Sequence, residues 1–85
     1  MAEQPKKEWV PVSERALVQR INRRLAEEGW ERLIKARTGR ARQQMGSWFM
    51  IDERSKLLVS KFINLEKFGR ELGVLGEYER LEGYN

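Results

Sequence analysis

Two apolar runs on either side of a turn-forming segment constrain the fold of this chain more than any other feature. Residues 48–51 and 57–63 are rich in β-branched and aromatic side chains, and Asp52-Glu53-Arg54-Ser55-Lys56 lies between them. This pattern predicts an antiparallel β-hairpin. An isolated hairpin is marginally stable in water, so further strands or helices must pack against it.

The segment before the hairpin predicts a helix and a third strand. Ser13 precedes residues 14–28, where apolar side chains recur at helical spacing, and Gly29 follows them. A capping residue, a periodic apolar face and a terminal glycine together predict a helix. Residues 30–37 then predict a strand.

A second helix is expected after the hairpin. Asn64 is a favourable N-cap for residues 65–72, and Gly73 follows them. The expected order is therefore helix, strand, strand, strand, helix. We expect an α+β fold in one small domain, with a three-stranded antiparallel sheet and both helices mainly on one face.

The hairpin register decides which face is buried. A turn centred on Arg54-Ser55 gives three pairs: Ile51 with Leu58, Phe49 with Ser60, and Trp48 with Lys61. This register predicts one face for the core, made by Phe49, Ile51, Leu58 and Phe62. The other face then holds Trp48, Met50, Leu57, Val59 and Lys61.

The second face is too apolar to be left in water. Residues 9–12 could fold over it, a second copy of the chain could cover it in a homodimer, or a host protein could bind there. In the last two cases the face is a protein-interaction surface made by four residues: Trp48, Met50, Leu57 and Val59. Trp48 would be its anchor, because large aromatic side chains dominate interface energetics.

The chain length of 85 residues is that of one domain. We expect a flexible tail at residues 1–8, the α+β domain at 9–75 and an acidic segment at 76–85. The apolar runs of the chain are far shorter than the ~20 residues that span a bilayer. The tail lacks the apolar core of a targeting sequence, which predicts a cytoplasmic protein without membrane contact.

The sequence contains neither cysteine nor histidine. Disulfides, thiolate or imidazole metal ligands, and Ser-His or Cys-His nucleophile pairs are therefore excluded. The one aspartate, Asp52, falls in the expected turn. We expect a protein that is not an enzyme and that holds no metal and no cofactor.

The positive charge of the chain is concentrated in one segment. Residues 31–46 carry five cations against Glu31 alone, an excess that equals the net charge of +4 for the whole chain. A concentrated basic segment suits phosphate, because neutralising adjacent phosphates releases condensed counterions. The segment could form a two-stranded arm around Thr38-Gly39, as in β-ribbon DNA readers, or a disordered loop that orders on RNA or DNA.

We therefore expect a non-catalytic accessory protein that binds DNA or RNA with little sequence specificity. The expected phosphate contacts are Lys35, Arg37, Arg40 and Arg42. The expected supporting contacts are Lys61 and Trp48. Binding to an acidic protein surface, or a purely solvated basic loop, are the alternatives for this segment.

The order of elements resembles that of the double-stranded RNA-binding domain, in which a lysine cluster at the start of the second helix grips phosphates. Here that position reads Asn64-Leu65-Glu66-Lys67, with one lysine and one glutamate. Residues 65–74 also resemble the first helix and turn of a helix-turn-helix unit, with Gly69 at the helix crossing and Gly73 in the turn. The recognition helix would then come from residues 76–83, whose net charge is negative.

Residues Ser13–Gly29 and the run Phe62–Leu75 together resemble small uncharacterised proteins of bacterial phages, plasmids and integrative elements. This resemblance implies a bacterial, cytosolic accessory protein of a mobile element. It attaches no activity to the chain.

Overall fold

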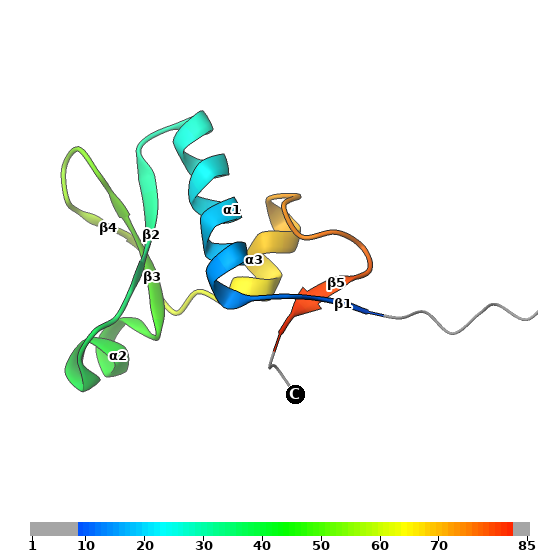
Figure 1. Cartoon of the computed structure of the whole chain (residues 1–85). Coiled ribbons are helices and arrows are strands. Elements are labelled where there is room, and N and C mark those ends of the chain that lie inside the picture. Colours follow the sequence, from blue (N-terminus) through cyan, green and yellow to red (C-terminus); the bar gives the residue numbers. More distant parts are fainter. Residues whose placement is uncertain (1–8, 83–85) are drawn as a thin grey trace, which may run out of the picture.

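The computed structural model describes residues 9–82, so the tail expected at residues 1–8 lies outside the described part. The helices are α1 (Glu14–Glu28), α2 (Gly39–Met45) and α3 (Leu65–Glu71). The strands are β1 (Val10–Val12), β2 (Glu31–Lys35), β3 (Trp48–Asp52), β4 (Leu58–Ser60) and β5 (Glu79–Leu81). The expected α+β class is confirmed (Figure 1), because β2, β3 and β4 form a three-stranded antiparallel sheet in that order.

Both helices predicted from the sequence are present with their N-caps. The Ser13 Oγ accepts a hydrogen bond from the backbone N–H of Ala16 at 3.1 Å, which satisfies one free donor in the first turn of α1. The Asn64 Oδ1 accepts from the N–H of Lys67 at 3.0 Å and caps α3 in the same way. Local capping chemistry therefore sets where each helix begins.

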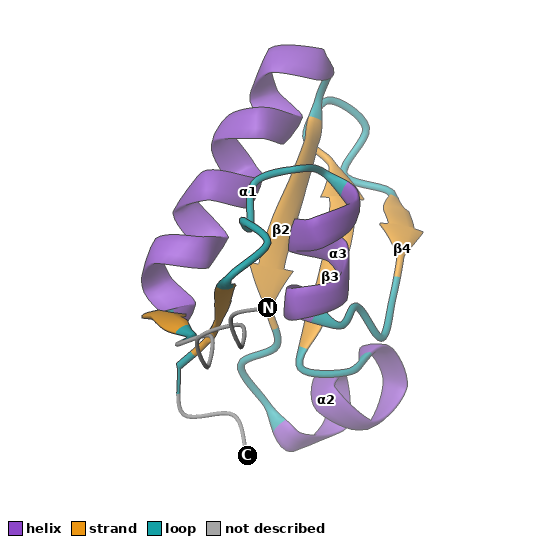
Figure 2. Ribbon diagram, turned by 90° about the vertical axis from the view of Figure 1, so that its right-hand side faces the viewer, coloured by secondary structure: helices purple, strands orange, loops and turns teal. Residues whose placement is uncertain are grey.

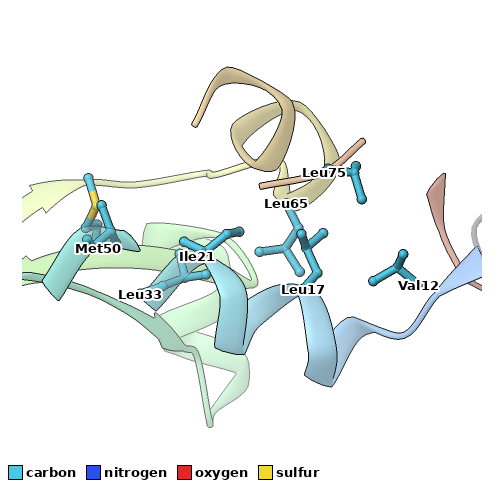
Figure 3. Close-up of a cluster of buried hydrophobic side chains, with 8 residues drawn as sticks. Val12, Leu17, Ile21, Leu33, Met50, Leu65 and Leu75 are labelled. Carbon is cyan, nitrogen blue, oxygen red and sulfur yellow. The ribbon is translucent and has the colours of Figure 1, made fainter. Parts of the chain in front are cut away.

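The core lies between the three-stranded sheet and the helices α1 and α3. Figures 1 and 2 show both helices on the same face of the three-stranded sheet, with α2 beyond one end of it. Leu17 and Ile21 of α1 are fully buried, and they pack in one cluster with Leu33, Met50 and Leu65 (Figure 3). The apolar face of α1 thus joins the sheet to α3.

The sheet faces predicted from the sequence are wrong. Met50, expected on the second face, is 8% exposed and belongs to the core, opposite Leu33 in the register. Leu58 and Phe62, expected in the core, are 47% and 60% exposed. Every residue from Trp48 to Ile51 is apolar, so the alternation pattern could not show which face of β3 the helices cover.

The predicted hairpin register is right at one pair only. Ile51 lies opposite Leu58 as expected, but a β-bulge shifts the register so that Ser60 lies opposite Met50 rather than Phe49. A bulge places two residues of one strand against one of the other. The expected pairing of Trp48 with Lys61 is lost for the same reason, since the backbone N–H of Ile63 donates to the Trp48 carbonyl at 3.1 Å.

A second, two-stranded sheet joins the two ends of the described chain. β1 pairs in parallel with β5, and hydrogen bonds of 2.8 Å run from Val10 N–H to the Tyr78 carbonyl and from Glu82 N–H to the Val12 carbonyl. One possibility from the sequence was that residues 9–12 fold over the three-stranded sheet. Residues 10–12 form β1 and pair with β5 instead. The segment 76–85, set apart on charge, contributes β5 to this structure.

The region after α3 also departs from a helix-turn-helix unit. Gly69 does lie at a close helix crossing, because a Cβ there would stand 2.9 Å from the Leu17 Cδ1 of α1. The chain then turns at Gly73, whose φ is +77°, and continues into β5 instead of a recognition helix. This resemblance is therefore limited to the first helix and the turn.

An ion pair holds β5 against α1. The Arg20 Nη1 lies 2.8 Å from the Glu79 Oε1, and the same guanidinium donates to the Val74 carbonyl at 3.0 Å. The Arg20 guanidinium holds the pKa of the Glu79 carboxyl below its usual value, and the hydrogen bond from the Gly76 N–H acts in the same direction. The folded state therefore favours the ionised carboxylate.

We expect Glu79→Gln to make the fold less sensitive to acid. Because the pKa of Glu79 is lowered on folding, its contribution to stability is complete above the unfolded value of about 4.5 and is lost as pH falls through the folded value. Glutamine does not titrate, so the variant should show a lower Tm near neutral pH and a smaller fall in Tm on acidification. Thermal unfolding followed by circular dichroism at several pH values measures this. Parallel pH curves for the two proteins would contradict it.

Candidate nucleic-acid interface

The basic segment forms neither a ribbon arm nor a disordered loop, so both predicted arrangements are wrong. Residues Gly39–Met45 form the short helix α2. The Thr38 Oγ1 accepts from the backbone N–H of Ala41 at 3.0 Å and caps the helix. Gly46 ends it in a conformation with φ +83°, and its N–H donates to the Arg42 carbonyl at 2.9 Å.

The sequence did contain a signal for α2. Thr38 is an N-cap residue, residues 40–44 are good helix formers, and Gly46 is a typical stop. Seven residues make fewer than two full turns, which is too short to show an apolar period. The charge of the segment therefore suggested an exposed arm, although its capping residues were those of a helix.

A basic groove runs along β2 and the residues that follow it, and Arg42 of α2 also lines it. It encloses about 590 Å³. The residues that line it are Arg32, Leu33, Ile34, Lys35, Ala36, Arg37 and Arg42. Four of these side chains are cationic and none is acidic, which makes the groove attractive to an anion.

Three predicted phosphate contacts line this basic groove, and the structure adds a fourth. Lys35, Arg37 and Arg42 come together there, while Arg32 was not singled out from the sequence. Arg32 lies three residues before the predicted contact Lys35, in a strand that the sequence did identify. Only the position of α2 beside this strand shows that Arg32 lies in the same groove.

The groove cations differ in how far they are neutralised. Lys35 Nζ lies 3.7 Å from the Glu14 carboxylate, and Arg32 Nη1 lies 3.3 Å from that of Glu53. Both pairs are exposed and contribute little stability. Arg37 and Arg42 form no ion pair with any residue of the described chain, so no carboxylate there neutralises them.

The other predicted contacts lie outside the groove. Arg40 is exposed on α2 but does not line it. Lys61 lies over the Phe62 ring at 5.9 Å, beside a separate hollow that it shares with α3. Trp48 is half-buried against the core and does not line the groove, although the Lys35 ammonium lies 5.8 Å from its ring centroid.

A larger hollow of about 810 Å³ adjoins the basic groove between α1 and β2, and Arg32 lines both. Its charged lining is mixed, with Arg23 and Arg32 against Glu31 and Glu53. The Asn22 Oδ1 accepts from the Leu33 N–H at 2.8 Å, which blocks part of the open β2 edge. This hollow therefore lacks a single sign of charge, and the strand edge beside it is partly occupied.

The four residues of the predicted protein-interaction surface differ widely in exposure. Met50 is buried and Trp48 is half-buried under the helices, whereas Leu57 and Val59 are 67% and 45% exposed. The four residues do not share one open face, because Met50 points toward α1. Of the eight large apolar side chains exposed in the described residues, four lie in or beside β4, namely Leu57, Leu58, Val59 and Phe62.

Within residues 9–82 there is no group of acidic side chains that could hold a metal ion, and no helix has the length and apolar character needed to cross a bilayer. Comparisons of the chain with protein-family models, with curated proteins and with solved structures find no match.

Proposed function

We propose that the protein binds nucleic acid without catalysis, through phosphates held in the basic groove. The observation that carries this proposal is the lining of the groove, which includes four cationic residues, Arg32, Lys35, Arg37 and Arg42, and no acidic residue. Guanidinium groups suit phosphate because their planar donors can bind two oxygens at once. Arg37 and Arg42 are the principal contacts, since no acidic side chain of the described residues competes for them.

The groove favours the backbone of a nucleic acid over its bases. Its cations come from β2, the link after it and α2, so they follow a line along the surface rather than a closed pocket. Backbone contacts fix the position of a protein on a nucleic acid and carry no sequence information. We therefore expect similar affinity for unrelated sequences of the same strand type.

The test is a titration of labelled duplex and single-stranded DNA and RNA at several salt concentrations, followed by fluorescence anisotropy. Four phosphate contacts predict a log-log salt slope of about −3.6 on duplex DNA. Replacing Arg37 and Arg42 together by alanine should bring this slope to about −1.8 and weaken binding at low salt roughly tenfold to 100-fold.

A matched control removes the same charge elsewhere. Lys56→Ala with Lys67→Ala also takes away two exposed cations, from the hairpin turn and from α3, and leaves the groove intact. This control should keep a slope near that of the wild type. Equal losses in both double variants would show that binding follows net charge rather than the groove. No binding of any strand type at low salt would refute the proposed function.

A further inference from the structure

Trp30 is an exposed aromatic residue beside the basic groove. It immediately precedes β2 and is 55% exposed. Trp30 lines the larger hollow between α1 and β2 together with Arg32, and Arg32 also lines the basic groove. Trp30 and Arg32 are two residues apart, which is about 7 Å in an extended chain. An aromatic ring therefore lies close to the proposed phosphate contacts.

The Trp30 ring stands between two hollows, and only one of them is occupied by a cation. The guanidinium carbon of Arg54 lies 5.0 Å from the centroid of the ring. Arg54 lines a smaller hollow of about 300 Å³ with Trp30 but does not line the larger one. This cation–π contact holds the ring from the hairpin turn. The part of the indole that borders the larger hollow is left for a ligand.

The charges of the larger hollow suit an uncharged ligand better than a phosphate. Its two cations, Arg23 and Arg32, are balanced by Glu31 and Glu53. Arg32 is also paired with Glu53, at 3.3 Å. A phosphate gains no net attraction there, whereas an uncharged ring needs none. The basic groove and the hollow next to it therefore favour different parts of one ligand.

The other side chains of the larger hollow suit a nucleobase. Gln19 and Asn22 line it from α1. The Asn22 Oδ1 is occupied by the Leu33 N–H, which leaves the amide NH₂ group of Asn22 as a donor. Polar side chains bind the edges of unpaired bases, and aromatic rings stack on their faces. The volume of about 810 Å³ is within the range of ligand sites, about 300–1,000 Å³.

We propose that the larger hollow receives an unstacked base of a single-stranded nucleic acid, with Trp30 as the ring on which the base stacks. Because the basic groove must hold the backbone that brings the base to Trp30, this inference rests on the proposed function. A base in a duplex is already stacked between its neighbours, and it reaches Trp30 only at the cost of unstacking. Duplex and single strand both contact the groove, whereas only the single strand also contacts Trp30.

The test is fluorescence anisotropy with three labelled probes: oligothymidylate of about 12 nucleotides, oligouridylate of that length and a DNA duplex of that length. Trp30→Ala should weaken binding of the single strands about fivefold to 150-fold and leave the affinity for the duplex unchanged. The salt slope on single strands should stay near the value of about −2.8 for four phosphate contacts, because an indole carries no charge. A loss on oligouridylate alone would assign the site to RNA, and a loss on oligothymidylate alone would assign it to DNA.

Trp9→Ala is the matched control. Trp9 is 49% exposed and also has a guanidinium over its ring, that of Arg80 at 5.3 Å. It lines neither the basic groove nor the larger hollow, so the variant should bind all three probes as the wild type does. Trp30→Phe keeps an aromatic ring and should retain most of the affinity for single strands. Thermal unfolding shows whether each variant remains folded.

Tryptophan emission gives a second measurement that does not require Trp30→Ala to fold. Stacking on a base quenches indole fluorescence, so oligothymidylate should quench the wild type and Trp9→Phe. Trp30→Phe should lose most of this quenching.

Two results would overturn the stacking and leave the groove in place: single-strand binding that Trp30→Ala does not weaken, or equal losses on duplex and single strands. Equal quenching of Trp9→Phe and Trp30→Phe would contradict it as well. A wild type that binds none of the probes at low salt would refute the proposed function itself.

Discussion

Leu17→Ala is expected to lower the free energy of unfolding by about 3–5 kcal/mol. Leu17 is fully buried between α1, α3 and the sheet, and its Cδ1 packs directly against the position of Gly69. Glycine has no side chain that could move into the cavity, so the loss should lie toward the upper part of this range. A domain of this size has only about 4–13 kcal/mol of stability, which leaves the variant marginal.

Urea unfolding at low micromolar concentration measures this loss. Leu58→Ala is the matched control, because it removes the same atoms from a side chain that is 47% exposed, and it should lower stability by less than about 1 kcal/mol. If Leu17→Ala has no folded baseline, Leu17→Val gives a smaller loss in the same direction. Equal losses for Leu17→Ala and Leu58→Ala would contradict the burial of the α1 face.

Gly46→Ala is expected to lower the free energy of unfolding by about 2–4 kcal/mol. The backbone of Gly46 has φ +83° and ψ 178°, a region that residues with a Cβ rarely enter. A Cβ there would also stand 2.8 Å from the Phe62 Cα, which is backbone and cannot move aside like a flexible side chain. The substitution should therefore disturb the contact between the end of α2 and Phe62, which follows β4.

Gly39→Ala tests the other end of the same helix and should have the opposite sign. A Cβ at Gly39 meets nothing within 4 Å, and the residue begins α2 with no positive φ. Alanine favours the helix and restricts the unfolded chain, so a gain of about 0.5–1 kcal/mol is expected. Thermal and urea unfolding of both variants measure the pair. A neutral Gly46→Ala would show that the close approach to Phe62 is not needed.

Local features of the sequence were sufficient for much of the fold. Ser13 and Asn64 cap α1 and α3 through their own side chains, and the apolar period of residues 14–28 identifies the face that α1 buries. The hairpin turn was predicted from the residue types at positions 52–56. In the structure Asp52 stabilises this turn by accepting hydrogen bonds from the N–H groups of Arg54 and Ser55. Each of these features depends on residues that are neighbours along the chain.

The candidate site was predicted in part. The charge of the sequence identified Lys35, Arg37 and Arg42, which the structure brings to one groove. It did not identify α2, because seven residues show no apolar period, and it placed Lys61 with a group that it does not join. Charge locates a basic segment along the chain, whereas the groove depends on where that segment folds.

The sequence by itself determined the fold class, the two capped helices and the concentration of positive charge. Only the tertiary structure decided which face of β3 became core, because every residue from Trp48 to Ile51 is apolar and either face could have been buried. The contact of α1 with Leu33 and Met50 settled that choice. The pairing of β1 with β5 was also decided by tertiary structure, since it joins residues that lie far apart in sequence. The bulge in β4 is a one-residue shift of register, which the composition of the strand does not encode.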